Sequence, residues 1–403
     1  MLKLALRNIF RHRFRTAMTL ASIVLGVIGL VLSGGFVADV YVQLAEALIH
    51  SQSGHLQIAR TGYFSSGSRS PEKYAVADPN RLERFLVAQP EVLDVLQRSN
   101  FSGLLNNGRT DWPIIGEGVE PSREAKLGSF MRIVMGRQLA NRDRFGILVG
   151  QEVAKALKLS PGDRVTLLAN TTEGALNSLE FKVIGVFETF SKEFDARAVR
   201  IPLTTAQDLL GSERVNTVVV SLKHTKDTDR VATRLRRTLD PTLFDLRTWS
   251  QLNDFYDKTI ALYRRQFGFL QVVILAMVLL SVANSVNMSV FERIGEFGTM
   301  MALGRRRGHV FSLIVAEGGL LGLIGAALGI AMGIGLAIAI SAIGIPMPPP
   351  PNANLGYTAL IRIVPEVLAS AFSVGFVAAS LAALLSALRM SRISVAEALS
   401  ANI

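Results

Sequence analysis

The sequence predicts an α-helical membrane protein with four transmembrane helices and a large mixed α+β extracytoplasmic domain. Nearly half of its 403 residues are apolar and only 19% are charged, against about 25% in soluble proteins. Four long stretches are almost free of charge, and each is long enough to cross a hydrocarbon core of ~30 Å as a helix. Arginine and lysine gather at the ends of these stretches, as membrane topology requires.

The four transmembrane helices are expected at residues 16–38, 266–291, 310–343 and 367–388. A cleaved signal peptide is the alternative for the first stretch. That stretch is longer than the apolar core of a signal peptide, and no A-x-A-like cleavage site follows it. The Pro-rich segment IPMPPPPN, residues 345–352, cannot continue a helix. The third span should therefore end near Ile343.

Positive charges orient the spans. Five cationic residues precede the first span, Arg293 and Arg305–Arg307 lie between the second and third, and Arg389 and Arg392 follow the fourth. All three clusters put the same side in the cytoplasm, so we expect a multi-pass inner-membrane protein with both termini cytoplasmic. The parts between the spans are an amphipathic helix on the inner leaflet at 1–15, the extracytoplasmic domain at 39–265, a cytoplasmic loop at 292–309, a short outer loop at 344–366 and a cytoplasmic tail at 389–403.

Local patterns within residues 39–265 indicate mixed structure. Ser53–Ala59 alternates as a strand does, and Leu179–Phe190 reads as another strand. Asp78 is a plausible N-cap with Pro79 at the first helical position, and apolar residues then recur at helical spacing to Arg98.

Three further elements of this domain are predicted. Val149–Ala169 should form a short helix, a turn and a strand, and Thr228–Leu239 a basic surface helix. No helix breaker occurs from Trp249 until Gly268. We therefore expect one continuous helix that joins the domain rigidly to the second span.

Composition excludes several classes of function. The net charge of +11 suggests nucleic acid, but the basic residues are not interleaved with stacking aromatics, so we expect no nucleic-acid partner. The absence of cysteine excludes disulfides and cysteine-ligated metals, and the five histidines have no metal-ligand spacing. No nucleophile-elbow GxSxG motif and no paired-carboxylate site stand out, so catalysis by this chain is not expected.

Several segments carry a family likeness in the order and at the spacing of a known group. They are LALRNIFRHRFRTAMTLASIVLGV at Leu4–Val27, GRQLANRDRFGILVGQEVAKALKLSPGDRVTLL at Gly136–Leu168, FERIGEFGTMMALG at Phe291–Gly304, VAEGGLLGLIGAALG at Val315–Gly329 and SRISVAEALS at Ser391–Ser400. Together they resemble the FtsX/MacB-type permeases of the type VII ABC transporter superfamily, which include MacB, LolC and LolE. The resemblance covers nearly the whole chain.

The resemblance implies a permease subunit driven by a separate ABC ATPase. The chain has no GxxxxGK[ST] motif and no Gly-Lys dipeptide, so ATP and Mg²⁺ would be bound by that partner and this chain would hold no cofactor. The other implied partners are a second permease chain, identical or different, membrane lipids, and a periplasmic adaptor or lipoprotein carrier. The implied activity is lipoprotein release or export of a lipophilic or peptide substrate. The alternative is a non-transporting, FtsX-like regulator of a periplasmic cell-wall hydrolase.

The cytoplasmic loop is the predicted contact with the ATPase. ERIGEFGTMMAL can form a short helix with an apolar stripe of Ile294, Phe297 and Met301. In the family this element is a coupling helix that docks in a cleft of the ATPase. The residues that match the family pattern are Glu292, Arg293, Glu296, Gly298, Ala302 and Gly304, of which Gly304 could also end the helix. Arg305–Arg307 could instead anchor the loop to lipid headgroups.

Two features of the spans point to packing or mechanics. Glu317 lies a couple of turns inside the third apolar run, where a charge is costly. It should pair with a basic residue near the cytoplasmic side or act directly in the mechanics. Small residues let helices approach closely in lipid, within one chain or between two. The predicted packing glycines are Gly26, Gly318, Gly322, Gly325 and Gly329.

Overall fold

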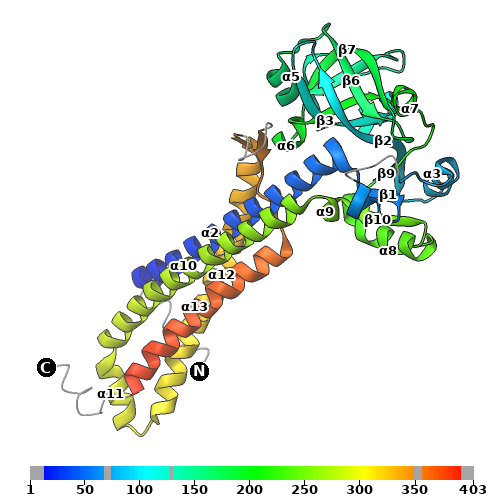
Figure 1. The fold of residues 1–403 in the computed structure, drawn as a ribbon. Helices are drawn as coiled ribbons and strands as arrows, with labels where there is room; N and C mark the ends of the chain where they lie inside the picture. The colour runs from blue at the N-terminus through cyan, green and yellow to red at the C-terminus, as the bar shows by residue number, and fades with distance from the viewer. Residues whose placement is uncertain (1–12, 68–73, 128–129, 349–355, 392–403) are drawn as a thin grey trace. The chain divides into compact units, whose positions relative to one another are not determined.

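The computed structural model describes residues 13–67, 74–127, 130–348 and 356–391. The chain divides into two units. Figure 1 labels the helices and strands of both. The helical unit holds the described residues up to Tyr41, Thr259–Pro346, and those from Thr358 onward. The mixed unit holds Val42–Lys258 and a few described residues next to the outer loop. The helix predicted at 1–15 and the tail predicted at 389–403 lie largely outside the described residues.

Four helices of the described chain are long and apolar enough to cross a membrane, which confirms the predicted number. They are α2 Arg13–Leu48, α10 Asp254–Glu292, α12 Arg307–Ile343 and α13 Pro365–Ser391. The third ends at Ile343, as the Pro-rich segment predicts. The first continues ten residues beyond its predicted end at residue 38, because the chain after Asp39 has no helix breaker until Gly54. Between α12 and α13 the strands β11 Ile345–Met347 and β12 Tyr357–Ala359 pair.

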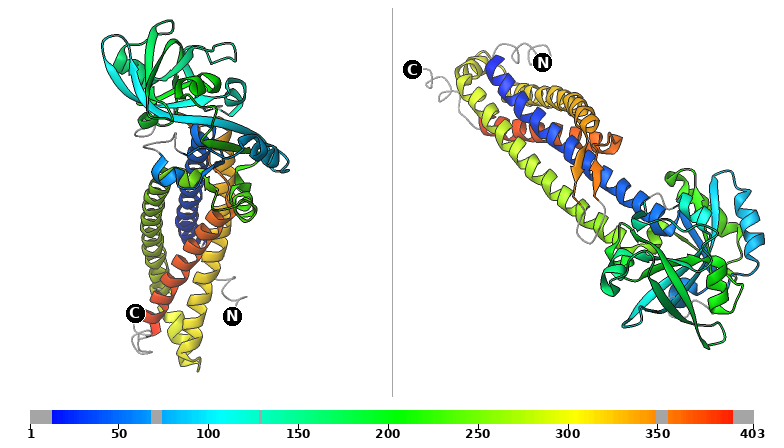
Figure 2. Two further views of the ribbon diagram at one scale, coloured as in Figure 1. Left: turned by 45° about the vertical axis from the view of Figure 1, so that its right-hand side comes forward. Right: turned by 90° about the horizontal axis from the view of Figure 1, so that it is seen from above.

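The helical unit has one apolar core, to which α2, α10, α11, α12 and α13 all contribute buried residues. Figure 2 shows α12 and α13 lying side by side. Val27 on α2 and Ala326 on α12 are both fully buried, and so are Ala379 and Ala382 on α13. Small residues at these positions allow close approach of the helix backbones.

The first part of the mixed unit is a four-stranded antiparallel sheet covered by two helices. The strand order is β10-β1-β9-β2. Along the chain the elements run β1 Leu56–Arg60, α3 Pro79–Val87, β2 Val92–Asn106, β9 Thr217–Leu222, α8 Thr228–Thr238 and β10 Phe244–Thr248. This βαβ–βαβ order is that of a ferredoxin-like fold, here interrupted between β2 and β9.

The second part is inserted between β2 and β9 and continues the same sheet. Its strands follow the order β2-β3-β8-β5-β7-β4, with β6 pairing β2 and β7. The strands are β3 Asp111–Val119, β4 Arg132–Gly136, β5 Gly146–Gly150, β6 Arg164–Asn170, β7 Leu176–Glu188 and β8 Ala198–Pro202. The helices are α4 Pro121–Leu127, α5 Gln151–Leu157, α6 Lys192–Asp195 and α7 Leu203–Leu210. Buried residues of these strands and helices, including Phe181 and Val199, form a core of their own.

Most local predictions for the mixed unit are confirmed. The strands around Ser53–Ala59 and Leu179–Phe190, the helix–turn–strand at Val149–Ala169 and the basic helix after Thr228 are all present. Asp78 caps α3, because its carboxylate accepts the Arg81 N–H at 3.1 Å.

Two predictions were wrong. The helix that starts at Pro79 ends at Val87 and does not continue to Arg98, since Pro90 disfavours helix at the preceding residue and residues 92–98 pair with β9. The helix from Trp249 is also not continuous. The short helix α9 Trp249–Leu252 ends at Asn253, whose φ of −126° and ψ of 77° are not helical. The second helix, α10, begins at the next residue, so the predicted unbroken link contains a joint.

Candidate coupling segment and buried charge networks

The segment between α10 and α12 forms the short helix α11, Ile294–Ala302, as the sequence predicts. Arg293, at φ −104° and ψ 12°, separates it from α10. Gly304 follows the helix at φ 92°, and its N–H donates to Met301 O at 3.0 Å. Glycine adopts a positive φ at no steric cost, so the predicted role of Gly304 at the helix end is confirmed.

Arg293, which is buried, and Glu317, which is half-buried, form an ion pair that ties the start of α11 to α12. Arg293 Nη1 lies 3.1 Å from Glu317 Oε2, and only 7% of Arg293 is exposed. Arg293 Nε also donates to Glu296 at 3.2 Å, and the guanidinium carbon lies 5.0 Å from the centre of the Phe297 ring. The predicted pairing of Glu317 is therefore confirmed. Removing the Glu317 charge would leave the buried Arg293 with Glu296 as its remaining ion-pair partner among these contacts, which is destabilising.

The apolar stripe of α11 faces the helical core. Phe297 is 1% exposed, and Ile294 and Met301 pack against the same cluster. Gly298 is buried as well. The predicted coupling residues that remain at the surface are Glu292, Glu296, Ala302 and Gly304. Leu303, which the sequence reasoning did not select, is 81% exposed beside them. In the sequence, Leu303 could have been noticed as an apolar residue that lies outside the apolar stripe and directly before Gly304.

The predicted packing glycines bring helices of the same chain together. A Cβ atom added at any of the five would overlap a side chain on a neighbouring helix. The pairs are Gly318 with Ala383 and Gly322 with Ala379 on α13, Gly325 with Ile23 and Gly329 with Val27 on α2, and Gly26 with Val278 on α10. The sequence left open whether the neighbour belongs to a second chain, and the structure places it in this one.

Asp39 is a buried carboxylate of the helical unit, and the sequence reasoning gave it no role. It is fully buried in α2, where it accepts the Leu360 N–H at 2.9 Å and Arg362 Nε at 2.8 Å. The Arg362 N–H in turn donates to Gly35 O at 3.2 Å. Asp39 therefore holds the segment before α13 against α2. The available signal was a lone carboxylate at the end of an apolar run.

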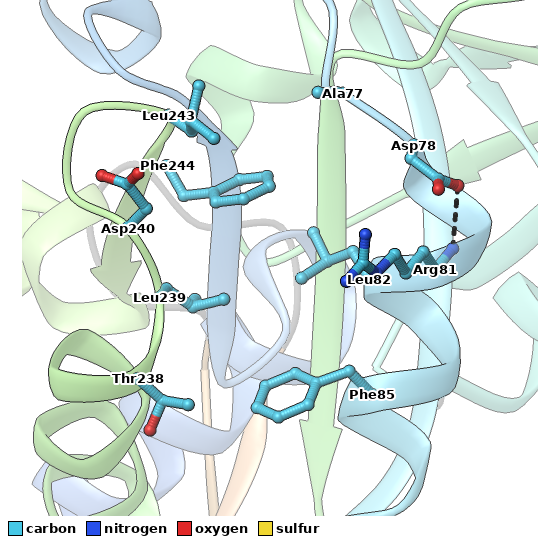
Figure 3. Close-up of a pocket in the computed structure, with 10 residues that line it drawn as sticks. All are labelled: Ala77, Asp78, Arg81, Leu82, Phe85, Thr238, Leu239, Asp240, Leu243 and Phe244. Atoms are coloured by element: carbon cyan, nitrogen blue, oxygen red, sulfur yellow. Dashed lines mark hydrogen bonds between the residues drawn. The ribbon is translucent and has the colours of Figure 1, made fainter.

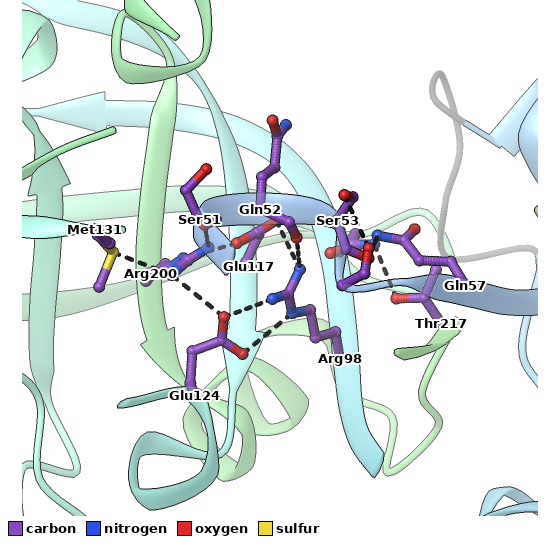
Figure 4. A network of polar contacts seen from close by, with 12 residues as sticks. Ser51, Gln52, Ser53, Gln57, Arg98, Glu117, Glu124, Met131, Arg200 and Thr217 are labelled. Carbon is purple, nitrogen blue, oxygen red and sulfur yellow. Dashed lines mark hydrogen bonds and ion pairs between the residues drawn. The ribbon is translucent and has the colours of Figure 1, made fainter. Parts of the chain in front are cut away.

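Four charged side chains form a second network inside the mixed unit (Figure 4). Arg98 Nη2 lies 2.5 Å from Glu124, and Arg200 Nε lies 2.8 Å from Glu117. Arg200 also contacts Glu124 at 3.3 Å. Burial opposes ionisation of Glu124, but the Arg98 and Arg200 guanidinium groups outweigh it and hold the pKa of Glu124 below its usual value.

This network also holds the short helical turn η1, Ile49–Ser53, which directly follows α2. Arg98 donates to Gln52 O at 2.5 Å, and Arg200 donates to Ser51 O at 3.0 Å (Figure 4). Arg98 lies on β2 and Arg200 on β8, so η1 is fixed to both parts of the mixed unit. Sequence reasoning missed these residues. Their signal is a single arginine in a strand that is otherwise mostly apolar or neutral.

A small apolar hollow of about 400 Å³ lies between α3 and the loop after α8 (Figure 3). Leu82 and Phe85 of α3 face Leu239 and Phe244 across it. The two carboxylates on its rim are engaged within their own turns, since Asp78 accepts from Arg81 N–H and Asp240 accepts from Thr242 N–H. We assign no ligand to this hollow. Across the part of the chain that the structure describes, no group of His, Asp or Glu could hold a metal ion.

Four membrane-length helices, with a large mixed domain inserted in the chain between the first and the second, are an architecture suited to a membrane permease. Residues 16–238 match the MacB-like periplasmic core domain, and residues 268–395 match the FtsX-like permease C-terminal domain. The chain belongs to the FtsX/MacB-type permease family.

Three curated relatives illustrate the range of the family. An uncharacterized ABC transporter permease of Methanocaldococcus jannaschii is 22% identical over 52% of this chain and 53% of its own length. The lipoprotein-releasing system transmembrane protein LolE of Haemophilus influenzae is 23% identical over 62% of each chain. The macrolide export ATP-binding/permease protein MacB of Campylobacter jejuni is 24% identical over 82% of this chain and 52% of its own length. This chain spans about half to three-fifths of the length of these relatives.

Proposed function

We propose that this chain is the membrane subunit of an ABC transporter and converts ATP hydrolysis by a separate ATPase into movement of its mixed unit outside the cytoplasm. The ATPase would bind ATP and Mg²⁺. In this proposal the chain spans the inner membrane with α11 and both termini in the cytoplasm. The observation that carries it is the Arg293–Glu317 pair, which fixes a surface helix to a membrane-length helix.

The contacts support a continuous mechanical path. Phe297 is buried in the helical core, so α11 cannot shift without moving its neighbours. Gly325 and Gly329 of α12 pack on α2. The helix α2 contains residues of both units and leads into η1, which Arg98 and Arg200 hold. A displacement at α11 would thus reach the mixed unit through packed side chains and one helix. The path has discrete, mutable contacts, which makes it open to test.

The cargo we propose is a lipoprotein or a lipophilic or peptide molecule handled on the outer side of the membrane. The names of LolE and MacB support these two kinds of cargo. The chain would work with a second permease chain, surrounded by lipid, and with a periplasmic adaptor or lipoprotein carrier. The size of the mixed unit favours transport over the regulator alternative, because an activator of a cell-wall hydrolase needs only a small docking surface.

Co-expression of this chain with a candidate ABC ATPase, followed by co-purification, tests the proposal. Glu296→Arg and Leu303→Ser alter the exposed side of α11, and each should lower recovery of the ATPase at least tenfold. Leu176→Ser is the matched control, since Leu176 is 69% exposed in the mixed unit. Glu317→Gln should keep the ATPase bound but lower its transport-stimulated turnover. Unchanged ATPase recovery in both α11 variants would refute docking at α11. A coupled ATPase with no movement of lipoprotein, lipophilic or peptide cargo would favour the regulator.

A further inference from the structure

We infer that the mixed unit binds a short acidic peptide segment in a cavity of about 550 Å³. Ligand pockets in proteins measure about 300–1,000 Å³, so the cavity has the size of a real site. The inference rests on the proposed function, because it assigns the cavity to a peptide of the cargo or of a periplasmic partner.

The cavity lies where several elements of the mixed unit meet. Its walls come from η1 and β1, from the middle of β2 and β3, from the segment between α6 and β8, and from the end of α9. Gln52 and Ser53 belong to η1, which follows α2, and Leu252 and Asn253 stand at the joint before α10. The cavity is therefore lined both by residues that follow α2 and by residues that directly precede α10.

The charge of the cavity favours an anion. Arg98 and Glu117 line it, but both belong to the buried network in which two arginines balance two glutamates. Arg197 adds an exposed guanidinium to the lining, and no carboxylate among the described residues pairs with it. A ligand carboxylate would give Arg197 the charge-assisted, bidentate partner that its planar group prefers.

The hydrogen-bonding groups favour a peptide over a lipid. Asn100 lines the cavity and donates its amide hydrogens to Tyr63 Oη at 2.9 Å and Thr217 Oγ1 at 3.1 Å, while its Oδ1 is buried below the cavity surface. Gln57 and Asn253, which also line the cavity, donate to backbone carbonyls, and each has an amide oxygen that can accept. Peptide N–H groups can satisfy such acceptors, and an acyl chain cannot.

Apolar side chains complete the lining. Phe194, Leu252 and Ile115 line the cavity, and Ile115 is 46% exposed. Such side chains suit the apolar residues of a peptide, while the amides and Arg197 fix its register. A peptide that contacts η1 and the α9–α10 joint together would favour one relative placement of these two segments. If the peptide favours one placement of the two segments by a certain factor, linkage requires that this placement bind the peptide more tightly by the same factor.

Fluorescence anisotropy on the full chain in nanodiscs of neutral lipid tests the inference. The probe is a fluorescein-labelled Phe-Asp-Leu peptide with a blocked carboxyl terminus, and its neutral match is Phe-Asn-Leu. We expect the acidic probe to bind at least tenfold more tightly. Arg197→Gln should remove that preference and Arg197→Lys should keep most of it. Arg237→Gln, an exposed arginine on α8 outside the cavity lining, is the matched control and should change nothing.

Three results would overturn the site. They are equal affinity for the two probes, a preference that survives Arg197→Gln, and no binding of either probe at millimolar concentration. Stronger competition by phosphatidic acid vesicles than by unlabelled Phe-Asp-Leu would assign the cavity to lipid and also reject the peptide. Co-purification of the ATPase is measured on the same samples. If the peptide does not bind but the α11 variants lose the ATPase as expected, only the cavity inference is rejected. If the peptide binds but the α11 variants keep the ATPase, the proposed coupling is rejected.

Discussion

His55 occupies a place in the mixed unit where only its neutral form fits. Its Nδ1 accepts the Leu222 N–H at 3.1 Å, and its Nε2 lies 3.2 Å from Thr225 Oγ1, which itself donates to Glu46. The proton must therefore be on Nε2. Burial and, to a smaller extent, the nearby His50 ring lower the pKa of His55 to about 4 against the opposing effect of Glu46. Protonation at Nδ1 would break the bond to the backbone.

This arrangement predicts a loss of stability in mild acid. The unfolded chain binds the proton near pH 6.5 and the folded chain only near pH 4, so the contribution of His55 is complete above pH 6.5. It is lost as the pH falls from 6.5 to 4 and amounts to at most about 3 kcal/mol. The fluorescence of Trp112 and Trp249, the two tryptophans of the chain, reports on the mixed unit within the intact protein.

Thermal unfolding followed by that fluorescence at pH 7 and pH 5 provides the measurement. The wild-type protein should unfold at a lower temperature at pH 5. His55→Asn, which keeps an acceptor for the Leu222 N–H, should flatten this dependence. His224→Asn is the control, since His224 is exposed in the same unit. An identical pH dependence in wild type and His55→Asn would contradict the assignment.

At the scale of elements, α12 presents glycines to two different surroundings. A Cβ at Gly322 would lie 2.8 Å from Ala379 Cβ on α13, whereas a Cβ at Gly319 would meet nothing within 4 Å. Gly322→Leu should therefore force α12 and α13 apart, which typically costs about 1–3 kcal/mol in a packed core. Gly319→Leu is a matched change on the same helix and should be tolerated. Thermal unfolding in detergent compares the two, and equal destabilisation would show that the α12–α13 contact is not the cause.

The sequence predicts elements well where local chemistry decides them. The spans follow from uncharged length, α3 from the Asp78 cap and Pro79, and the end of α12 from the prolines that follow it. Prediction failed where distant pairing decides. Residues 92–98 have apolar spacing compatible with a helix, but β9 gives them backbone partners in a sheet, and no local signal reports β9. The joint at Asn253 has a local cause instead, because Asn253 Nδ2 bonds to Trp249 O, four residues earlier, at the end of the short helix.

The candidate sites divide in the same way. Charge and spacing predicted a short helix between the second and third spans, and the family resemblance gave it a coupling role, yet the inward turn of Phe297 depends on how α11 packs on its neighbours. The pairing of Glu317 could be expected because a membrane charge needs a partner, but the choice of Arg293 could not. The network of Arg98 and Arg200 could not be predicted, because its contacts are distant in the chain. Arg200 bonds to Glu117, 83 positions away, and to Ser51, 149 positions away.

For the whole molecule, α10 is the least covered of the membrane-length helices. Only 17% of its most apolar window is buried, against 44% for α2. Met277 and Leu280 are 65% and 67% exposed on it. A helix this apolar and this open must be covered by lipid or by another helix. Since we propose a second permease chain, α10 is where that chain should pack.

Single cysteines test this contact in a chain that has none of its own. We expect Met277→Cys or Leu280→Cys to give a disulfide-linked dimer in native membranes, because equivalent positions of two chains meet near a two-fold axis. Val377→Cys on α13 is the matched control, exposed at 43% but on a helix we expect to face lipid. Ala378→Cys, fully buried beside it, controls for non-specific oxidation. Dimer yield equal at Val377 and on α10 would indicate random collision, and no product along α10 would place the partner chain elsewhere.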